Sequence, residues 1–110
     1  MKEKILKVIN EFKSSNPAAI EDKYMNGDCY VFARALVDKF GGAIVYLPIE
    51  NHFVAAIDYE FYDIRGLIPS DTIYECYLWD EYWKIEPLDA DRVEYYCIQG
   101  KEELKFQPFE

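Results

Sequence analysis

The chain has 110 residues, 51% of them hydrophobic and 17% aromatic, which fits a single folded domain over 1–110 and excludes an intrinsically disordered protein. Its formal net charge of -9 repels phosphate backbones and anionic lipid, which argues against direct nucleic-acid or membrane binding. No apolar run is long enough to span a bilayer and the N-terminus lacks a secretory pattern, so we expect a soluble, cytoplasmic protein.

Two N-terminal segments carry apolar residues at helical spacing. The first predicts a helix over 4–13, which ends before Pro17 because proline cannot continue a helix without losing a hydrogen bond. Residues 18–27 are expected to form a loop or a short helical turn. The second pattern, over 29–40, is the stronger one, and its apolar stripe comprises Cys29, Phe32, Ala33, Leu36, Val37 and Phe40.

The second helix has clear boundary signals. Asp28 is a suitable N-cap, because its carboxylate can accept a backbone N–H of the first turn. Gly41 and Gly42 supply a C-terminal stop. These signals place Cys29 in the first turn of a largely buried helix.

After residue 42, aromatic and β-branched residues indicate strands. We predict strands over 43–47, 52–57, 61–64, 73–79 and 93–98. A loop over 65–72 and an acidic, irregular segment over 80–92 separate the later strands, and the tail over 100–110 holds a short edge strand or none. Helices followed by an antiparallel run of strands indicate an α+β domain, in which N-terminal helices pack on an antiparallel β-sheet.

The cysteines do not suggest a disulfide framework, because Cys29, Cys76 and Cys97 are odd in number and widely spaced. A single histidine and no close cysteine pair make a structural metal site improbable, and we expect no cofactor. Cys76 and Cys97 fall in strand-like runs, where a cysteine usually acts as a small buried residue.

Cys29 has the position of an activated thiol. At a helix N-terminus, the helix dipole and the unpaired N–H groups stabilise a thiolate and can hold the oxyanion that forms when it attacks a carbonyl. The carboxylate of Asp28 opposes ionisation of the neighbouring thiol, but less so if it is engaged in capping the helix. The structural alternative is a small buried residue at a helix start.

His52 and Asp63 could complete a catalytic site as base and orienting residue. If the hairpin turn centres on 58–59, residues 57 and 60 pair, and His52 and Asp63 share a face as diagonal neighbours, about 7–8 Å apart. If the turn centres on 59–60, Asp63 moves two residues away and the contact becomes doubtful. The sequence leaves both turns open, and each residue alone could be an ordinary strand residue.

A family resemblance appears at these positions. Gly27-Asp28-Cys29 opening a helix, then His52-Phe53-Val54, then Tyr62-Asp63-Ile64-Arg65-Gly66, resembles small papain-like proteins of bacteria and phages, in the broad group that includes the NlpC/P60 cysteine peptidases. The resemblance covers residues 26–66 and implies a minimal papain-like domain. It also implies that Cys29 is the nucleophile, His52 the base and Asp63 the orienting residue.

The sequence departs from that family pattern at two places. No glutamine precedes Cys29 to complete a papain-style oxyanion hole, and the nearest amide is that of Asn26. The residue after the cysteine is Tyr30, where NlpC/P60 enzymes usually carry a small residue. A bulky ring at that position could narrow or close the cleft.

Three functions therefore remain open. The first is a cysteine hydrolase or transferase acting on an amide or thioester bond of a peptide or amide substrate. The second is a catalytically silent domain of the same fold that binds a protein partner. The third is an acidic phage-type inhibitor that occupies a basic partner surface, and its face would comprise Glu75, Asp80, Glu81, Glu86, Asp89, Asp91 and Glu94, interleaved with Tyr82, Trp83 and Tyr95.

Overall fold

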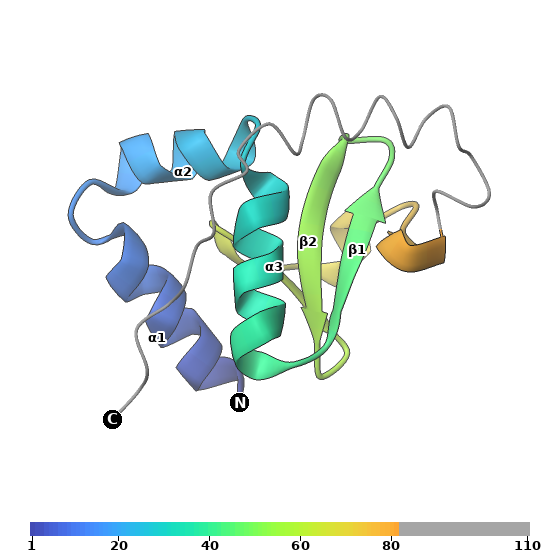
Figure 1. Cartoon of the computed structure of the whole chain (residues 1–110), viewed down its shortest axis with the longest axis horizontal. Coiled ribbons are helices and arrows are strands. Elements are labelled where there is room, and N and C mark those ends of the chain that lie inside the picture. Colours follow the sequence, from blue (N-terminus) through green and yellow to red (C-terminus); the bar gives the residue numbers. More distant parts are fainter. Residues whose placement is uncertain (82–110) are drawn as a thin grey trace.

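A computed structural model describes residues 1–81 of the chain. Its helices are α1 (Lys2–Lys13), α2 (Pro17–Met25), α3 (Cys29–Phe40) and the short 3-10 helix η1 (Ser70–Thr72). Its strands are β1 (Ala43–Leu47), β2 (His52–Ile57), β3 (Glu60–Asp63), β4 (Gly66–Ile68) and β5 (Tyr77–Leu78). Figure 1 shows that α1, α2 and α3 precede the strands of the sheet along the chain.

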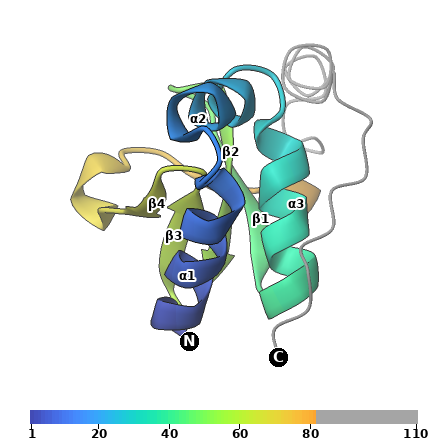
Figure 2. The same ribbon diagram turned by 90° about the vertical axis from the view of Figure 1, so that its left-hand side faces the viewer.

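The strands form one antiparallel sheet in the order β4-β3-β2-β1-β5, so β2 occupies its centre. The three long helices pack together on one face of this sheet, and α3 runs alongside β2 (Figures 1 and 2). The predicted α+β architecture, with N-terminal helices on an antiparallel sheet, is confirmed.

The main core lies between the helices and the sheet. It contains Ile5 and Ile9 of α1, Tyr24 of α2, and Phe32 and Leu36 of α3. The sheet completes it with Ala55, Ile57, Tyr62 and Ile64. Because side chains alternate along a strand, residues 53, 55 and 57 face the helices, and residues 52 and 54 face the other way.

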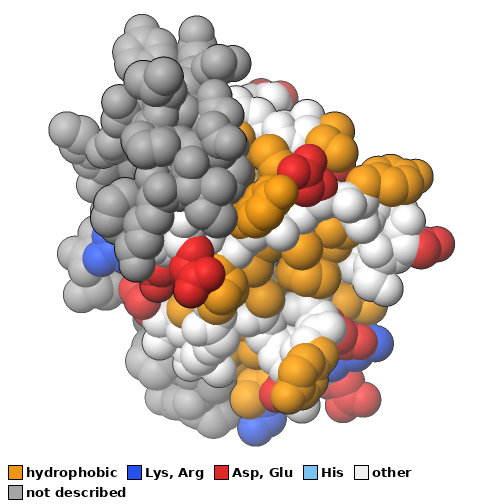
Figure 3. Space-filling model, turned by 90° about the vertical axis from the view of Figure 1, so that its right-hand side faces the viewer, with side chains coloured by type: hydrophobic (Ala, Val, Ile, Leu, Met, Phe, Trp, Pro, Cys, Tyr) orange, Lys and Arg blue, Asp and Glu red, His pale blue; other side chains and the backbone are white. Residues whose placement is uncertain are grey.

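The face of the sheet that looks away from the helices is also apolar. Val45, Leu47, Val54 and Ile68 form a second buried cluster there. A shallow hollow beside it is lined by Val45, Ala56, Phe61, Tyr77 and Leu78, among others. Figure 3 shows hydrophobic side chains gathered on the side of the molecule that carries β1 and β5.

Several sequence predictions match the observed elements. The bounds of α3 and of β1 and β2 are those predicted, and α1 extends the predicted helix by two residues. Gly41 and Gly42 end α3 with φ values of 84° and 99°, which a residue with a side chain adopts only at a cost.

Two predictions about the helical part were wrong. Residues 18–27 were expected to form a loop or a short helical turn, but most of them belong to the nine-residue helix α2. Pro17 opens this helix at its first position, where the missing N–H costs nothing, and Asn16 caps it by accepting from Ala19 N–H at 3.4 Å. Asp28 is the N-cap residue of α3, but its side chain makes no capping hydrogen bond and lies 3.9 Å from Lys23 Nζ.

The predicted loop over 65–72 and the strand over 73–79 were also wrong in part. Gly66–Ile68 pairs with β3 as β4, and Ser70–Thr72 forms a 3-10 turn. Only Tyr77–Leu78 pairs as a strand in the second segment. Cys76, expected in a buried strand, is exposed.

The remaining predictions lie outside the described residues. They comprise most of the acidic segment over 80–92, the strand over 93–98, the tail over 100–110, Cys97 and most of the acidic face of the inhibitor hypothesis. Within residues 1–81, no helix is long and apolar enough to cross a bilayer.

Substitution of the two glycines after α3 tests their different surroundings. A Cβ at Gly42 would lie 2.1 Å from the carbonyl oxygen of Ala56, whereas a Cβ at Gly41 meets nothing within 4 Å. We expect Gly41→Ala to cost about 1–3 kcal/mol of stability, because its φ of 84° and ψ of -173° lie in a region that essentially only glycine adopts. Gly42→Ala should cost clearly more, because the backbone of β2 must also shift. Urea unfolding of both variants measures this, and equal midpoints would contradict it.

Candidate functional site

Cys29, His52 and Asp63 come together at one end of the sheet. Cys29 is the first residue of α3, His52 the first of β2 and Asp63 the last of β3. All three are buried, with 2%, 4% and 2% of their surface exposed. His52 and Asp63 are the buried polar residues of the described chain, so they require partners.

The β2–β3 hairpin positions His52 against Asp63. Ile57 pairs with Glu60 across a two-residue turn, in which Asp58 and Tyr59 have φ values of 52° and 66°. Two positive φ values are typical of the tight turn whose twist matches a hairpin. The turn therefore centres on 58–59, the first of the two predicted alternatives. His52 and Asp63 share a face, and His52 Nε2 lies 2.9 Å from Asp63 Oδ2.

Arg65 holds the Asp63 carboxylate from the other side. Its Nη2 donates to Oδ2 at 2.6 Å, its Nε donates to Oδ2 and Oδ1 at 3.0 and 3.2 Å, and its backbone N–H donates to Oδ1 at 2.7 Å. Sequence reasoning assigned no role to Arg65. The signal was Asp63 at the start of a tight turn, because an aspartate side chain often accepts a hydrogen bond from the backbone N–H two residues on.

Cys29 lies near enough to the His52 ring to raise its pKa. Since Asp63 occupies Nε2, the nitrogen that remains is Nδ1, which is buried and makes no hydrogen bond within the described residues. The thiol is packed in a cluster with Ala33, Tyr46 and Phe53. The geometry therefore brings the three predicted site residues together around one imidazole.

The surroundings shift the pKa of both ionisable groups of the His52–Asp63 pair. Burial lowers the pKa of His52, but the hydrogen bond to Asp63, the neighbouring Cys29 thiol and the charges of both residues outweigh it and raise the pKa from 6.5 to about 9. Burial raises the pKa of Asp63, but hydrogen bonds from His52 and Arg65 lower it overall. At neutral pH the pair is an imidazolium and a carboxylate.

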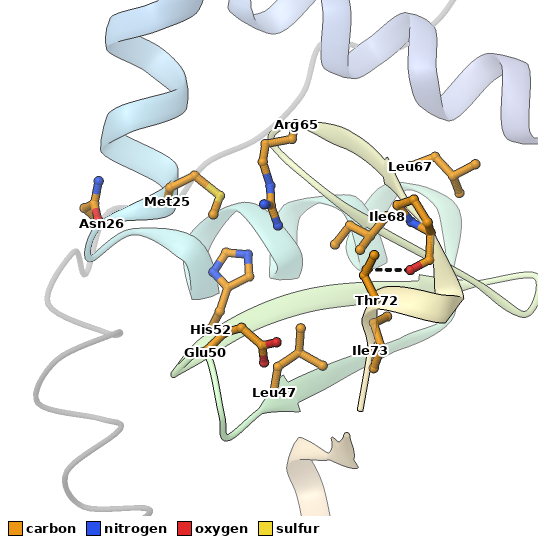
Figure 4. Close-up of a pocket in the computed structure, with 11 residues that line it drawn as sticks. Met25, Asn26, Leu47, Glu50, His52, Arg65, Leu67, Ile68, Thr72 and Ile73 are labelled. Atoms are coloured by element: carbon orange, nitrogen blue, oxygen red, sulfur yellow. Dashed lines mark hydrogen bonds between the residues drawn. The ribbon is translucent and has the colours of Figure 1, made fainter. Parts of the chain in front are cut away.

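A pocket of about 560 Å³ opens beside His52. Its apolar wall includes Met25, Leu47, Leu67, Ile68, Pro69 and Ile73, and its polar groups come from Asn26, Glu50, His52, Arg65 and Thr72. In Figure 4, the guanidinium of Arg65 and the ring of His52 point toward one another across one end of this pocket. Cys29 is not part of its lining.

The polar and aromatic side chains around the start of α3 differ in which partners they already contact. Asn26, the nearest side-chain amide, donates from Nδ2 to the backbone oxygen and to Oδ1 of Asp22, at 3.1 and 2.9 Å. The side chain of Asp28, the N-cap residue of α3, makes no capping hydrogen bond to the first turn. The Tyr30 ring packs edge-on against Phe53, with ring centroids 5.1 Å apart.

Among residues 1–81, no group of three or more histidine, cysteine or acidic side chains is arranged to hold a metal ion. The Asp63 carboxylate and the Nε2 of His52 are instead satisfied by hydrogen bonds and ion pairing with one another and with Arg65.

A comparison with known families gives one match. The model of a family described as Phage YunG-like protein matches residues 5–98, most of the chain. Neither curated proteins nor solved structures give a significant match. The matched range includes Cys29, His52 and Asp63.

Nuclear magnetic resonance of the imidazole tests the His52–Asp63 pair without assignment ambiguity, because His52 is the only histidine. We expect a titration midpoint near pH 9. Asp63→Asn should lower it by more than one unit, since burial then acts with less opposition. Asp58→Asn is the matched control, because it removes an exposed carboxylate from the hairpin turn. A wild-type midpoint near 6.5 would contradict the pairing.

The same pair makes stability depend on pH in two directions. The raised pKa of His52 stabilises the fold fully below pH 6.5, and this contribution is lost as the pH rises through about 9. The lowered pKa of Asp63 stabilises the fold above its ordinary value of 3.8, and this contribution is lost as the pH falls below it.

Urea unfolding between pH 6 and pH 10 measures the first of these effects. The stability advantage of the wild type over His52→Gln should shrink on the order of 3 kcal/mol across this range. A difference that stays constant with pH would show that His52 does not change its proton affinity on folding.

Proposed function

We propose that this chain, which belongs to the Phage YunG-like protein family, is a cysteine hydrolase or transferase that acts on an amide or thioester bond. Cys29 would be the nucleophile, His52 the acid and base, and Asp63 the residue that orients the imidazole. The observation that carries the proposal is the His52 ring itself, which Asp63 binds at Nε2 and which interacts with the thiol at the start of α3. Catalysis by a thiol needs this arrangement, in which a histidine lies beside the thiol and a third residue orients the histidine.

The reaction begins with an imidazolium and a thiolate. The pKa of His52 near 9 keeps the ring protonated at pH 7, and an adjacent cation stabilises a thiolate. The thiolate sulfur attacks the substrate carbonyl carbon and forms a tetrahedral oxyanion. The imidazolium then donates its proton to the leaving nitrogen or sulfur, and the bond to that group breaks to give an acyl-enzyme.

The second half of the reaction uses the neutral imidazole. It takes a proton from water, or from the amine or thiol of an acceptor, as that group attacks the acyl carbon. Collapse of the second tetrahedral intermediate restores the Cys29 thiolate and the His52 imidazolium. Water as acceptor gives hydrolysis, and another nucleophile gives transfer.

The first-turn N–H groups of α3 are the best candidates for oxyanion donors. They lie at the start of the helix that carries Cys29, and the side chain of Asp28 does not cap them. Asn26 is a poorer candidate, because its amide already donates to Asp22. The absence of a glutamine upstream is thus compatible with the chemistry only if backbone groups supply the donors.

The pocket beside His52 is the proposed place for the substrate. Its mainly apolar wall suits an aliphatic or aromatic side chain of a peptide, and its volume is that of an ordinary small-ligand site. We also place this reaction in the cytoplasm, where a thiol stays reduced. The order of the site residues and the position of Cys29 at a helix start support a minimal papain-like domain.

A second function, a catalytically silent binding domain of the same fold, has one observation in its favour. Cys29 is only 2% exposed and does not line the pocket. A substrate carbonyl could reach the sulfur only if the packing around it opened. In a silent domain, the pocket would bind a partner and the buried thiol would have no chemical role.

Alkylation of Cys29 by iodoacetamide as a function of pH tests the enzyme proposal. The background carries Cys76→Ser and Cys97→Ser, with and without His52→Ala. We expect a midpoint well below the usual thiol value of about 8.5 that rises by more than one unit in the His52 variant. An ordinary midpoint that ignores His52 would overturn the proposal.

The rate of the same alkylation separates the two functions. In a silent domain, iodoacetamide reacts only with molecules in which the domain has opened. Gly42→Ala lies beyond the far end of α3 from the thiol, and it should then accelerate the reaction by the factor by which it raises the opened fraction. An enzyme predicts a fast reaction that this variant leaves unchanged.

A further inference from the structure

Asp63 receives more donors than the orientation of an imidazole requires. Its Oδ2 accepts from Arg65 Nη2 at 2.6 Å and Nε at 3.0 Å as well as bonding His52 Nε2 at 2.9 Å. Its Oδ1 accepts the backbone N–H and the Nε of Arg65. The single negative charge of this carboxylate is therefore divided between two cations, and the guanidinium has the larger share of the contacts.

A count of charges shows what the site lacks. His52 and Asp63 are both nearly fully buried, where a charge without a counter-charge is costly. With Arg65, the site holds two cations and one anion. Half of the Arg65 side chain is exposed to water, which screens its charge in part, but the buried imidazolium has no such relief. Among the described groups that act on His52, Cys29 is the second that can carry a negative charge.

We propose that Arg65 is a positioning residue of this site: by pairing with Asp63, it leaves the His52 imidazolium in need of a second counter-ion, which the Cys29 thiolate supplies. The inference rests on the proposed thiol chemistry and deepens it. Arg65 touches neither the sulfur nor the substrate carbonyl in this scheme. It acts through Asp63 on the charge balance, and so favours an ionised nucleophile at neutral pH.

Other charges near Arg65 do not replace Cys29 in this role. Glu21 of α2 and Glu50 of the turn after β1 both act on the guanidinium. Glu21 is also bound to Lys13 at 2.7 Å, and Glu50 is exposed. Neither is a cause of the raised pKa of His52, whose partners are Asp63 of β3 and Cys29 of α3.

The two effects that Arg65 could have predict opposite shifts of the His52 pKa. If Arg65 sets the charge balance, its removal takes a cation from the site, so the titration midpoints of both the imidazole and the thiol rise. If Arg65 only holds Asp63 in place, its removal loosens the hydrogen bond to Nε2, and the midpoint of the imidazole falls. The direction of the change is therefore decisive.

The experiment measures both midpoints in the full chain with Cys76→Ser and Cys97→Ser, the imidazole by nuclear magnetic resonance and the thiol by alkylation rate. For Arg65→Gln we expect both midpoints to rise by about one unit, so that Cys29 reaches half ionisation at a pH about one unit higher than in the wild type. Arg65→Lys should restore most of this shift in the thiol midpoint, because it keeps the charge. Arg34→Gln is the matched control, since it removes an exposed arginine from α3.

The outcomes separate this inference from the proposed function. A wild-type thiol with an ordinary midpoint that His52→Ala does not change overturns both. A low, His52-dependent thiol midpoint that Arg65→Gln leaves unchanged overturns only the role of Arg65. A fall of the imidazole midpoint in Arg65→Gln, as in Asp63→Asn, also overturns it, and assigns Arg65 to holding Asp63 alone.

Discussion

The hydrogen bond between His52 and Asp63 is the interaction on which the candidate site depends. Both side chains are buried, so each would be strongly destabilising without the other. Their meeting requires one hairpin register, because a slip of one residue in β3 would turn Asp63 to the helical side of the sheet. The two-residue turn at Asp58 and Tyr59 fixes that register through its positive φ values. A surface turn thus determines which side chains meet at the opposite end of the hairpin.

The site is best understood as one coupled group of charges. Asp63 lies between Arg65 and His52, and His52 lies between Asp63 and Cys29. A proton added to any member changes the proton affinity of the others, so the titrations belong to the group. The helix start adds a favourable field for an anion at Cys29. The buried position of the Cys29 sulfur opposes its reaction with a substrate, because reactivity needs access as well as ionisation.

Much of this arrangement followed from the sequence. The helical spacing and the glycine pair predicted α3. The order of the residues, with Cys29 at a helix start and His52 and Asp63 on successive strands, was enough to predict all three as site residues. The hairpin register was not determined, because both turns satisfied the same pattern of apolar residues. Only the positive φ values distinguish them. Arg65 was assigned no role, although an aspartate side chain often accepts a hydrogen bond from the backbone N–H two residues on, as Asp63 does in the turn between β3 and β4.

Other errors have local physical causes. Pro17 was taken only as a helix terminator, yet a proline at the first helical position of α2 loses no hydrogen bond. Asp28 occupies the N-cap position without capping, and its carboxylate lies toward Lys23 instead. Cys76 was placed in a long strand, of which only Tyr77–Leu78 pairs with β1. In each case the residue type was informative and its partner was not visible in the sequence.

The most direct test of the ion pair is a pH titration of the chain labelled with ¹³C at the cysteine β-carbons, in the Cys76→Ser and Cys97→Ser background. The β-carbon shift reports whether the Cys29 sulfur carries a proton, and the imidazole signals of the same sample report on His52. We expect Cys29 to ionise well below pH 7 and His52 to lose its proton in a second step near pH 9. A thiol that keeps its proton to pH 8 while His52 is charged would contradict it.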